Sequence, residues 1–295
     1  MSDVTAPARQ RLLDEADWLA RADAHRQRAE RFLGPHLRRA GQDHPVWDFL
    51  FTYYSLRPRQ LRHWHPGYGT VLAGGEAVRR YRDRSGYLPV PQGVTVGHEY
   101  LRARVDTVRF IAGLLKATAG RPAQLNCFGM HEWAMVYRTD AVRHARVPLR
   151  LGARATDAAV ESMPLRCSHF DAFRFFTAEA VPRNAGAPAR DTQADWEQPG
   201  CLHANMDLYK WCYKLGPLAD SELLFDCLEL AAAARELDMR ASPYDLSAYG
   251  YPPIVVEHPA GRAEYVRCQG AIAQWAAPLR AALLDRCDLL LRAAA

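Results

Sequence analysis

The sequence predicts a mostly helical α+β protein that forms a single domain with a few short strands. Three observations lead to this fold class. Of its 295 residues, 49% are hydrophobic and 24% charged, which is typical of a globular chain and excludes a disordered or fibrous one. Apolar residues recur at helical spacing in most segments. The few β-favouring stretches are short and lie between turn signals.

The N-terminal part predicts two helices. Leu12, Leu13, Ala16 and Leu19 are spaced for a helix within residues 8–40. A second helix is expected over 45–56, because a proline suits its first turn and Arg57-Pro58 stops it. We expect residues 1–75 to form a helical region packed on the rest, and residues 76–295 to form the main α+β region that carries a His/Asp/Glu pocket.

The main region alternates helices with short extended pieces. Helices are expected over 97–119, from about 124 through HEWAMVY, and over 203–215, 221–237 and 261–295. Strands are expected over 147–151 and over 166–177, where phenylalanines favour β-structure. Turns are expected at 88–93, and residues 182–199 are the best loop candidate.

Cysteine usage and missing signals indicate a cytoplasmic protein. The seven cysteines are odd in number and include no C-x-x-C pair, which favours reduced thiols over a disulfide framework. No run of 18 apolar residues provides a membrane span. The first residues lack the apolar core of a signal peptide.

The charge balance is basic and dominated by arginine. The net charge is +5, and of the 38 basic residues only Lys116, Lys210 and Lys214 are lysines. Arginine binds phosphate through its planar fork, so this bias fits a nucleic-acid partner. A codon bias toward G and C would produce the same composition. Motifs typical of dinucleotide-binding, P-loop, serine-hydrolase and zincin enzymes are absent.

Three segments place histidine near carboxylate. His131 adjoins Glu132 in a predicted helix, His169 and Asp171 would share one face of a strand, and His203 and Asp207 are one helical turn apart. Any one pair could be an ordinary surface or core contact. If the three segments converge, they form a pocket of histidines and carboxylates.

Further candidates surround these pairs. Asp238, Arg240 and Tyr244 follow a helix, where an Asp–Arg bridge at the helix end is the alternative interpretation. Lys210 is either solvated or part of the site. The expected substrate-binding residues are Trp133, Tyr137, Phe173, Asn205, Lys210, Trp211, Asp238, Arg240 and Tyr244.

Four segments carry a resemblance to a known family. HEWAMVYR, LRCSHFDAFRFFT, QPGCLHANMDLYKW and ELDMRASPYDL resemble a bacterial family labelled 3-methyladenine DNA glycosylase. The resemblance implies cleavage of the N-glycosidic bond of an alkylated purine in DNA, without a cofactor. The sequence has neither a helix-hairpin-helix with a catalytic aspartate nor tandem helical repeats, so no catalytic residue is transferred by motif.

The function is therefore predicted as a glycosylase, with two alternatives. For base excision, Asp171, Asp207, Glu132 and His169 are the catalytic candidates, and aromatic side chains would hold the flipped base. The first alternative is an enzyme that binds one or two Fe, Mn or Zn ions through His131, His169, His203 and Asp207 and acts on a small molecule or modified nucleoside. It predicts that at least three of six residues surround one centre: His131, Glu132, His169, Asp171, His203 and Asp207. The second alternative is a protein that binds a small nucleobase-like ligand. No membrane and no obligate protein partner are expected.

Overall fold

The structure, a computed structural model, describes residues 10–38, 43–140 and 146–295. It is dominated by helices and carries one small sheet, which confirms the predicted α-dominated α+β class. The helices are α1 (Glu15–Leu37), α2 (Trp47–Thr52), α3 (Pro58–Leu61), α4 (Gly75–Tyr81), α5 (His98–Arg102), α6 (Val105–Ala119), α7 (Met130–Ala134), α8 (Gly152–Ser162), α9 (Phe170–Phe173), α10 (Gln193–Trp196), α11 (Leu202–Leu215), α12 (Ser221–Arg240) and α13 (Pro259–Ala294). The strands are β1 (Arg11–Leu13), β2 (Thr70–Ala73), β3 (Tyr87–Val90) and β4 (Gly93–Val96).

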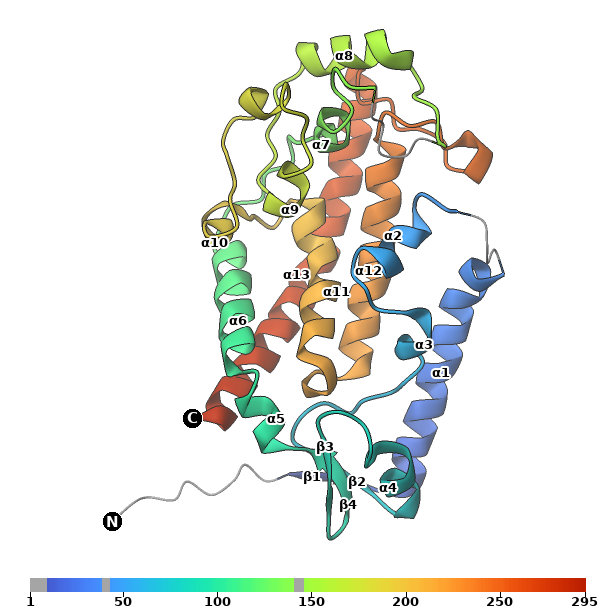
Figure 1. Ribbon diagram of the computed structural model, residues 1–295, viewed down its shortest axis with the longest axis vertical. Coiled ribbons are helices and arrows are strands. Elements are labelled where there is room, and N and C mark those ends of the chain that lie inside the picture. The colour runs from blue at the N-terminus through green and yellow to red at the C-terminus, as the bar shows by residue number, and fades with distance from the viewer. Residues whose placement is uncertain (1–9, 39–42, 141–145) are drawn as a thin grey trace.

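Four long helices form the body of the molecule. Helix α11 packs against α12 and α13, and α6 packs against α13 (Figure 1). Val108, Ile111 and Leu115 form an apolar stripe on α6 that is buried in this bundle. The sheet closes one end of the bundle and α8 lies at the other (Figure 1). The predicted helices over 203–215, 221–237 and 261–295 are confirmed as α11, α12 and α13.

Helix α11 is buried almost on every side, yet it is not apolar. Its neighbours cover His203, Asp207 and Lys210, each of which is less than 9% exposed. Charged residues are seldom buried to this extent without partners, because leaving water costs several kcal/mol. The interior around α11 must therefore contain a network of compensating charges.

The sheet joins strands from both sides of residue 75. Its order is β1-β2-β4-β3, with β1 parallel to β2 and the other neighbours antiparallel. Gly93 opens β4 with a φ of 153°, and a Cβ there would lie 1.9 Å from the Leu72 carbonyl oxygen, so only glycine fits. The expected division into 1–75 and 76–295 stays a prediction.

Several predicted elements were wrong. The expected strand over 166–177 is extended only at its start and then forms the short helix α9, while 147–151 makes only an isolated bridge from Leu149 to Tyr244. The expected turns at 88–93 contain strand residues of β3 and β4, and the expected loop at 182–199 includes α10. The helix expected over 8–40 begins at Glu15, and its predicted ends at 8–9 and 39–40 lie outside the described residues.

Within the described ranges, no helix is both long enough and apolar enough to cross a membrane.

Candidate functional site

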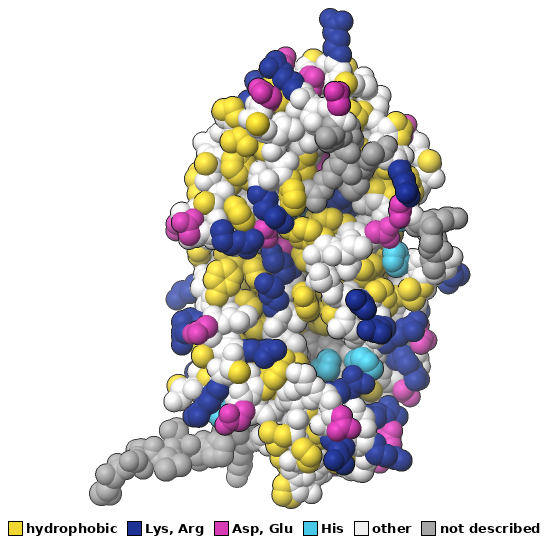
Figure 2. Space-filling model, in the orientation of Figure 1, with side chains coloured by type: hydrophobic (Ala, Val, Ile, Leu, Met, Phe, Trp, Pro, Cys, Tyr) yellow, Lys and Arg dark blue, Asp and Glu magenta, His cyan; other side chains and the backbone are white. Residues whose placement is uncertain are grey.

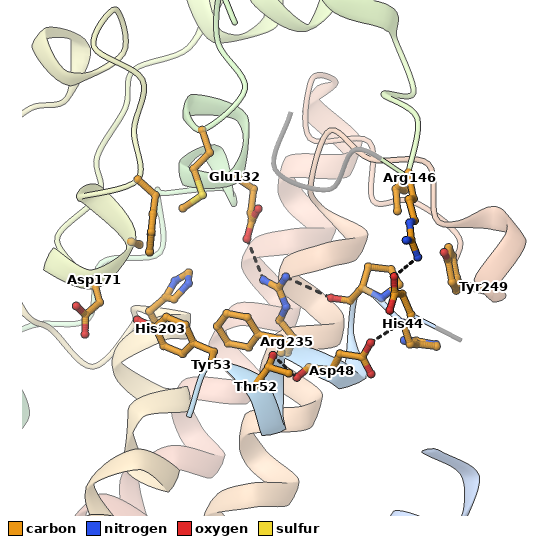
Figure 3. Close-up of a pocket in the computed structure, with 17 residues that line it drawn as sticks. His44, Asp48, Thr52, Tyr53, Glu132, Arg146, Asp171, His203, Arg235 and Tyr249 are labelled. Atoms are coloured by element: carbon orange, nitrogen blue, oxygen red, sulfur yellow. Dashed lines mark hydrogen bonds and ion pairs between the residues drawn. The ribbon is translucent and has the colours of Figure 1, made fainter. Parts of the chain in front are cut away.

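A cavity of about 610 Å³ opens beside the N-terminal end of α11. Helices α2, α7, α9, α11 and α12 contribute to its wall. Phe49, Tyr53, Phe175 and Tyr249 supply aromatic surface (Figure 3). Its polar lining includes Glu132, Asp171, His203 and Arg235, together with Asp43, His44, Asp48, Thr52 and Arg146. Such a mixture of aromatic surface and a few converging polar groups is typical of a small-molecule site.

A strained turn sets the position of α7. Phe128 and Gly129 both have positive φ, 53° and 71°, which is unusual for a bulky residue such as phenylalanine. A Cβ on Gly129 would lie 3.1 Å from the Cβ of Ala241, so the turn packs closely against the end of α12. This turn brings the buried His131 and Glu132 to face α12, and strain of this kind is concentrated at functional sites.

The first polar cluster, here called the cavity-side group, consists of His131, His203 and Asp238. Their candidate ligand atoms all lie within 4.8 Å of one another. His131 Nε2 is 2.7 Å from Asp238 Oδ1. His203 lines the cavity and forms no hydrogen bond within the described ranges. The group is therefore reached from the cavity through the His203 ring.

Arg235 stabilises the carboxylates beside this group. Its Nη1 donates to Glu132 Oε1 at 2.9 Å and to Asp238 Oδ2 at 3.0 Å (Figure 3 shows the first of these contacts). The guanidinium also lies over the Phe49 ring, 4.3 Å from its centroid. Because Arg235 occupies one oxygen of Asp238, the other oxygen is left to His131.

The second polar cluster, here called the inner group, consists of His169, Glu197 and Asp207. Their candidate ligand atoms also lie within 4.8 Å of one another. His169 Nε2 is 3.3 Å from Glu197 Oε1 and 3.3 Å from Asp207 Oδ2. All three residues are at most 2% exposed. His169 precedes α9, Glu197 follows α10 and Asp207 lies on α11, so three segments far apart in the sequence meet here.

Lys210 joins the inner group to the cavity wall. Its Nζ donates to Asp207 Oδ2 and to Asp171 Oδ2, both at 2.8 Å. Tyr54 donates its hydroxyl to the other oxygen of Asp207 at 3.2 Å. Asp171, at the cavity wall, also pairs with Arg190 at 2.9 Å. Lys210 is thus a buried ion-pair partner rather than a solvated side chain.

The three histidines form a continuous row. The ring centroid of His203 is 4.6 Å from that of His131 and 5.3 Å from that of His169. Burial, and then the neighbouring His131, lower the pKa of His203 well below its usual value. A neutral imidazole has a free nitrogen lone pair, which is the form that binds metal.

The pKa values of the outer two histidines are shifted in the opposite direction, upward. Burial alone lowers the pKa of His131, but the Asp238 carboxylate outweighs burial and raises the pKa well above its usual value. Burial likewise opposes the charge on His169, but Glu197 and Asp207 raise its pKa. Burial raises the pKa of Glu197 itself. Without an ion, protons on these histidines therefore balance the buried carboxylates.

The three predicted His–carboxylate segments do converge, but they divide into two neighbouring groups. The cavity-side group holds His131 and His203, and the inner group holds His169 and Asp207. Each group is completed by a carboxylate outside the expected metal-binding set, Asp238 or Glu197. No three of the six residues expected around one centre form a single group within the described ranges, so that geometric expectation was wrong.

None of the nine predicted substrate-binding residues lines the cavity. Trp133 is fully buried and donates to the Ala241 carbonyl, and Tyr137 donates to Glu161. Arg240 binds the Pro252 carbonyl. The remainder pack elsewhere or belong to the buried network: Phe173, Asn205, Lys210, Trp211, Asp238 and Tyr244.

Sequence reasoning missed several residues of the site. Arg235 lies three residues before Asp238 on one helix, and that spacing could have paired them. Glu197 was assigned to a loop. Phe49 and Tyr53, in the helix expected over 45–56, were not among the candidate residues, although both line the cavity.

Comparisons with known proteins add no relative to this geometry. No family model, no curated protein and no solved structure matches the chain. The predicted resemblance to the glycosylase family stays a prediction.

Proposed function

We propose that the protein is a metal-dependent enzyme that acts on a small, ring-bearing molecule. One observation carries the proposal. His203 belongs to a buried trio of potential metal ligands and at the same time lines a cavity of about 610 Å³. An ion held by His131, His203 and Asp238 would therefore be reachable by a molecule in the cavity.

The ligand types suit a catalytic transition metal. Two imidazoles and one carboxylate with open positions are typical of non-haem Fe(II) sites, and a similar set binds catalytic zinc. A divalent ion at such a site polarises a substrate oxygen or lowers the pKa of a bound water. Arg235 would hold the Asp238 ligand in place through its second oxygen, as outer partners commonly do.

The cavity wall suits a planar substrate with hydrogen-bonding edges. The rings of Tyr53 and Phe175 offer stacking faces, and Glu132 faces the same space. Oε1 of Glu132 accepts a hydrogen bond from Arg235, whereas Oε2 accepts none from the described residues. Glu132 could therefore accept a proton or a hydrogen bond from a molecule in the cavity.

Elemental analysis tests the metal. Protein purified without a chelator or a metal-affinity step should contain Fe, Mn or Zn at near-stoichiometric levels, and Asp238→Asn should lower that content. A surface change such as Glu161→Gln is the matched control, because it removes the same charge far from the histidines. Metal-free wild-type protein that also fails to take up these ions would overturn the proposal. A turnover screen of nucleosides and other ring-bearing molecules then compares loaded wild type with Asp238→Asn.

Base excision from alkylated DNA is the second candidate function. It is favoured by the basic residues at the cavity edge, where Arg174 lies 4.3 Å from the centroid of Phe175 and Arg190 lies 4.7 Å from that of Phe170. Basic side chains also stand among hydrophobic ones on the face drawn in Figure 2. Cations laid on aromatic rings suit single-stranded or flipped nucleotides.

A base-release assay separates the two functions. A glycosylase should liberate 3-methyladenine from alkylated DNA in the presence of a chelator and should lose this activity in Asp171→Asn. The metal-dependent reading predicts no base release under those conditions.

Either function is expected to operate in the cytoplasm, where the seven free cysteines would stay reduced.

A further inference from the structure

We propose that the inner group, His169, Glu197 and Asp207, is a second cation site, so that the protein holds two divalent ions. The proposal extends the proposed function, which needs only the ion of the cavity-side group. It rests on the spacing of the three ligand atoms, on the charges around them and on their seclusion from the cavity.

The spacing at His169 is that of ligands around an ion. Hydrogen bonds between charged partners are about 2.7–2.9 Å long, as the 2.7 Å contact of His131 with Asp238 shows in the same interior. His169 Nε2 is instead 3.3 Å from two different carboxylate oxygens. One N–H can point well at only one of them. A tetrahedral ion with ligands at about 2.0–2.2 Å places those ligands about 3.3–3.6 Å apart.

The charges around the inner group leave room for a cation. Lys210 bridges Asp207 and Asp171. Glu197 Oε1 accepts from Gln193 Nε2 and faces His169 Nε2, but Glu197 forms no ion pair with a lysine or arginine in the described parts of the chain. Burying such a carboxylate without a permanent cation costs several kcal/mol. A divalent ion beside Glu197 would remove that cost.

The orientation of His169 is set by Nε2 alone. Its Nδ1 is buried and has no hydrogen-bond partner within the described ranges. The side chain is 1% exposed. The Nε2 edge of the ring therefore faces both carboxylates, and an ion bound there would be shared by His169, Glu197 and Asp207.

The two groups differ in ligand chemistry and in access. The cavity-side group offers two imidazoles and one carboxylate, whereas the inner group offers one imidazole and two carboxylates. Carboxylate-rich sites bind Mn²⁺ or Fe²⁺ better than they bind softer ions. The inner residues do not line the cavity. An ion there would therefore neutralise the buried carboxylates and stabilise the structure, whereas the cavity-side ion would contact the substrate.

Metal stoichiometry after reloading tests the second site. Full-length protein is stripped with a chelator, reloaded with Mn²⁺ without oxygen, and freed of loose ions by gel filtration before mass-spectrometric metal analysis. Wild type should hold two equivalents, Glu197→Gln one, and Asp238→Asn one. Asp171→Asn is the matched control, since it removes an equal charge beside Lys210 without touching the trio, and it should keep two.

The outcomes separate this inference from the proposed function. A single equivalent in wild type, lost in Asp238→Asn and kept in Glu197→Gln, overturns the second site and leaves the first. Wild type that takes up none of Mn²⁺, Fe²⁺ and Zn²⁺ overturns both. If Glu197→Gln does not fold, calorimetric titration of the stripped wild type decides, because it must saturate at two ions rather than one.

Discussion

The cavity-side group and the inner group are built from the same residue types but are closed by different neighbours. Helix α11 serves both, since His203 faces one group and Asp207, one turn later, faces the other. The first group is fixed by Arg235 and opens on the cavity, whereas the second is tied to Lys210 and is sealed. One buried helix thus contributes to a group that opens on the cavity and to a group that is closed off from it.

The largest effect is expected at Arg235. Arg235→Met should destabilise the ion-free protein by about 3–5 kcal/mol, because Asp238 and Glu132 then lose the one arginine that pairs with them among the described residues. Urea unfolding at pH 7 in the presence of a chelator measures this loss. A change below about 1 kcal/mol would show that the Asp238 and Glu132 carboxylates are not ionised in the folded protein.

The effect of metal on stability should depend on pH. His131 and His169 have raised pKa values in the folded ion-free protein, so their contribution is complete below about pH 6.5 and fades as the pH rises through the folded values. An ion that replaces these protons binds more tightly at higher pH. At free metal about 100 times Kd, the gain is about 2.7 kcal/mol.

Unfolding of stripped and loaded protein at pH 6 and pH 8 measures this dependence. In the stripped protein, the contribution of these two histidines to the free energy of unfolding should be smaller at pH 8 than at pH 6. The gain on adding Mn²⁺ at a fixed total concentration should be larger at pH 8. An equal gain at both values would mean that the ion does not compete with the histidine protons.

A smaller effect is expected on the inner side. Lys210→Met should cost about 2 kcal/mol, less than the change at Arg235, because Asp171 keeps Arg190 and Asp207 keeps Tyr54 and His169. The same unfolding assay compares the two variants directly. If Lys210→Met lowers the free energy of unfolding more than Arg235→Met does, the inner group depends on the Lys210 ammonium more than on a bound metal ion.

The smallest effect is expected at Tyr54. Tyr54→Phe removes one hydrogen bond to Asp207 and should cost about 1 kcal/mol. Tyr53→Phe, at the cavity wall next along the chain, is the matched control and should change stability by less than about 0.5 kcal/mol. Similar losses in both variants would indicate that packing, rather than the Asp207 contact, determines the cost.

Local pattern predicted the site residues better than their partners. Histidine beside carboxylate pointed to His131, His169 and His203, whose rings the fold brings into one row, but each local pair is split in the fold. Glu132 binds Arg235 while His131 binds Asp238, 107 residues away. Asp207 turns to His169 rather than to His203. Such partners are decided by tertiary packing, which spacing within one segment does not contain.

The fold shows the same limit. Long helices were predicted because their apolar periodicity repeats over several turns. The strand expected around His169 was wrong because the phenylalanines of α9 favour β-structure locally while packing requires a helical turn. The four-residue strands β3 and β4 were missed because Pro89, Pro91 and Gly93 read as turns.

Anomalous diffraction from crystals grown with Mn²⁺ tests the central claim most directly. The account predicts a peak within about 2.0–2.3 Å of a ring nitrogen of His131, a ring nitrogen of His203 and an oxygen of Asp238. The absence of a peak there, with His131 still hydrogen-bonded to Asp238 as at 2.7 Å in the present structure, would contradict it.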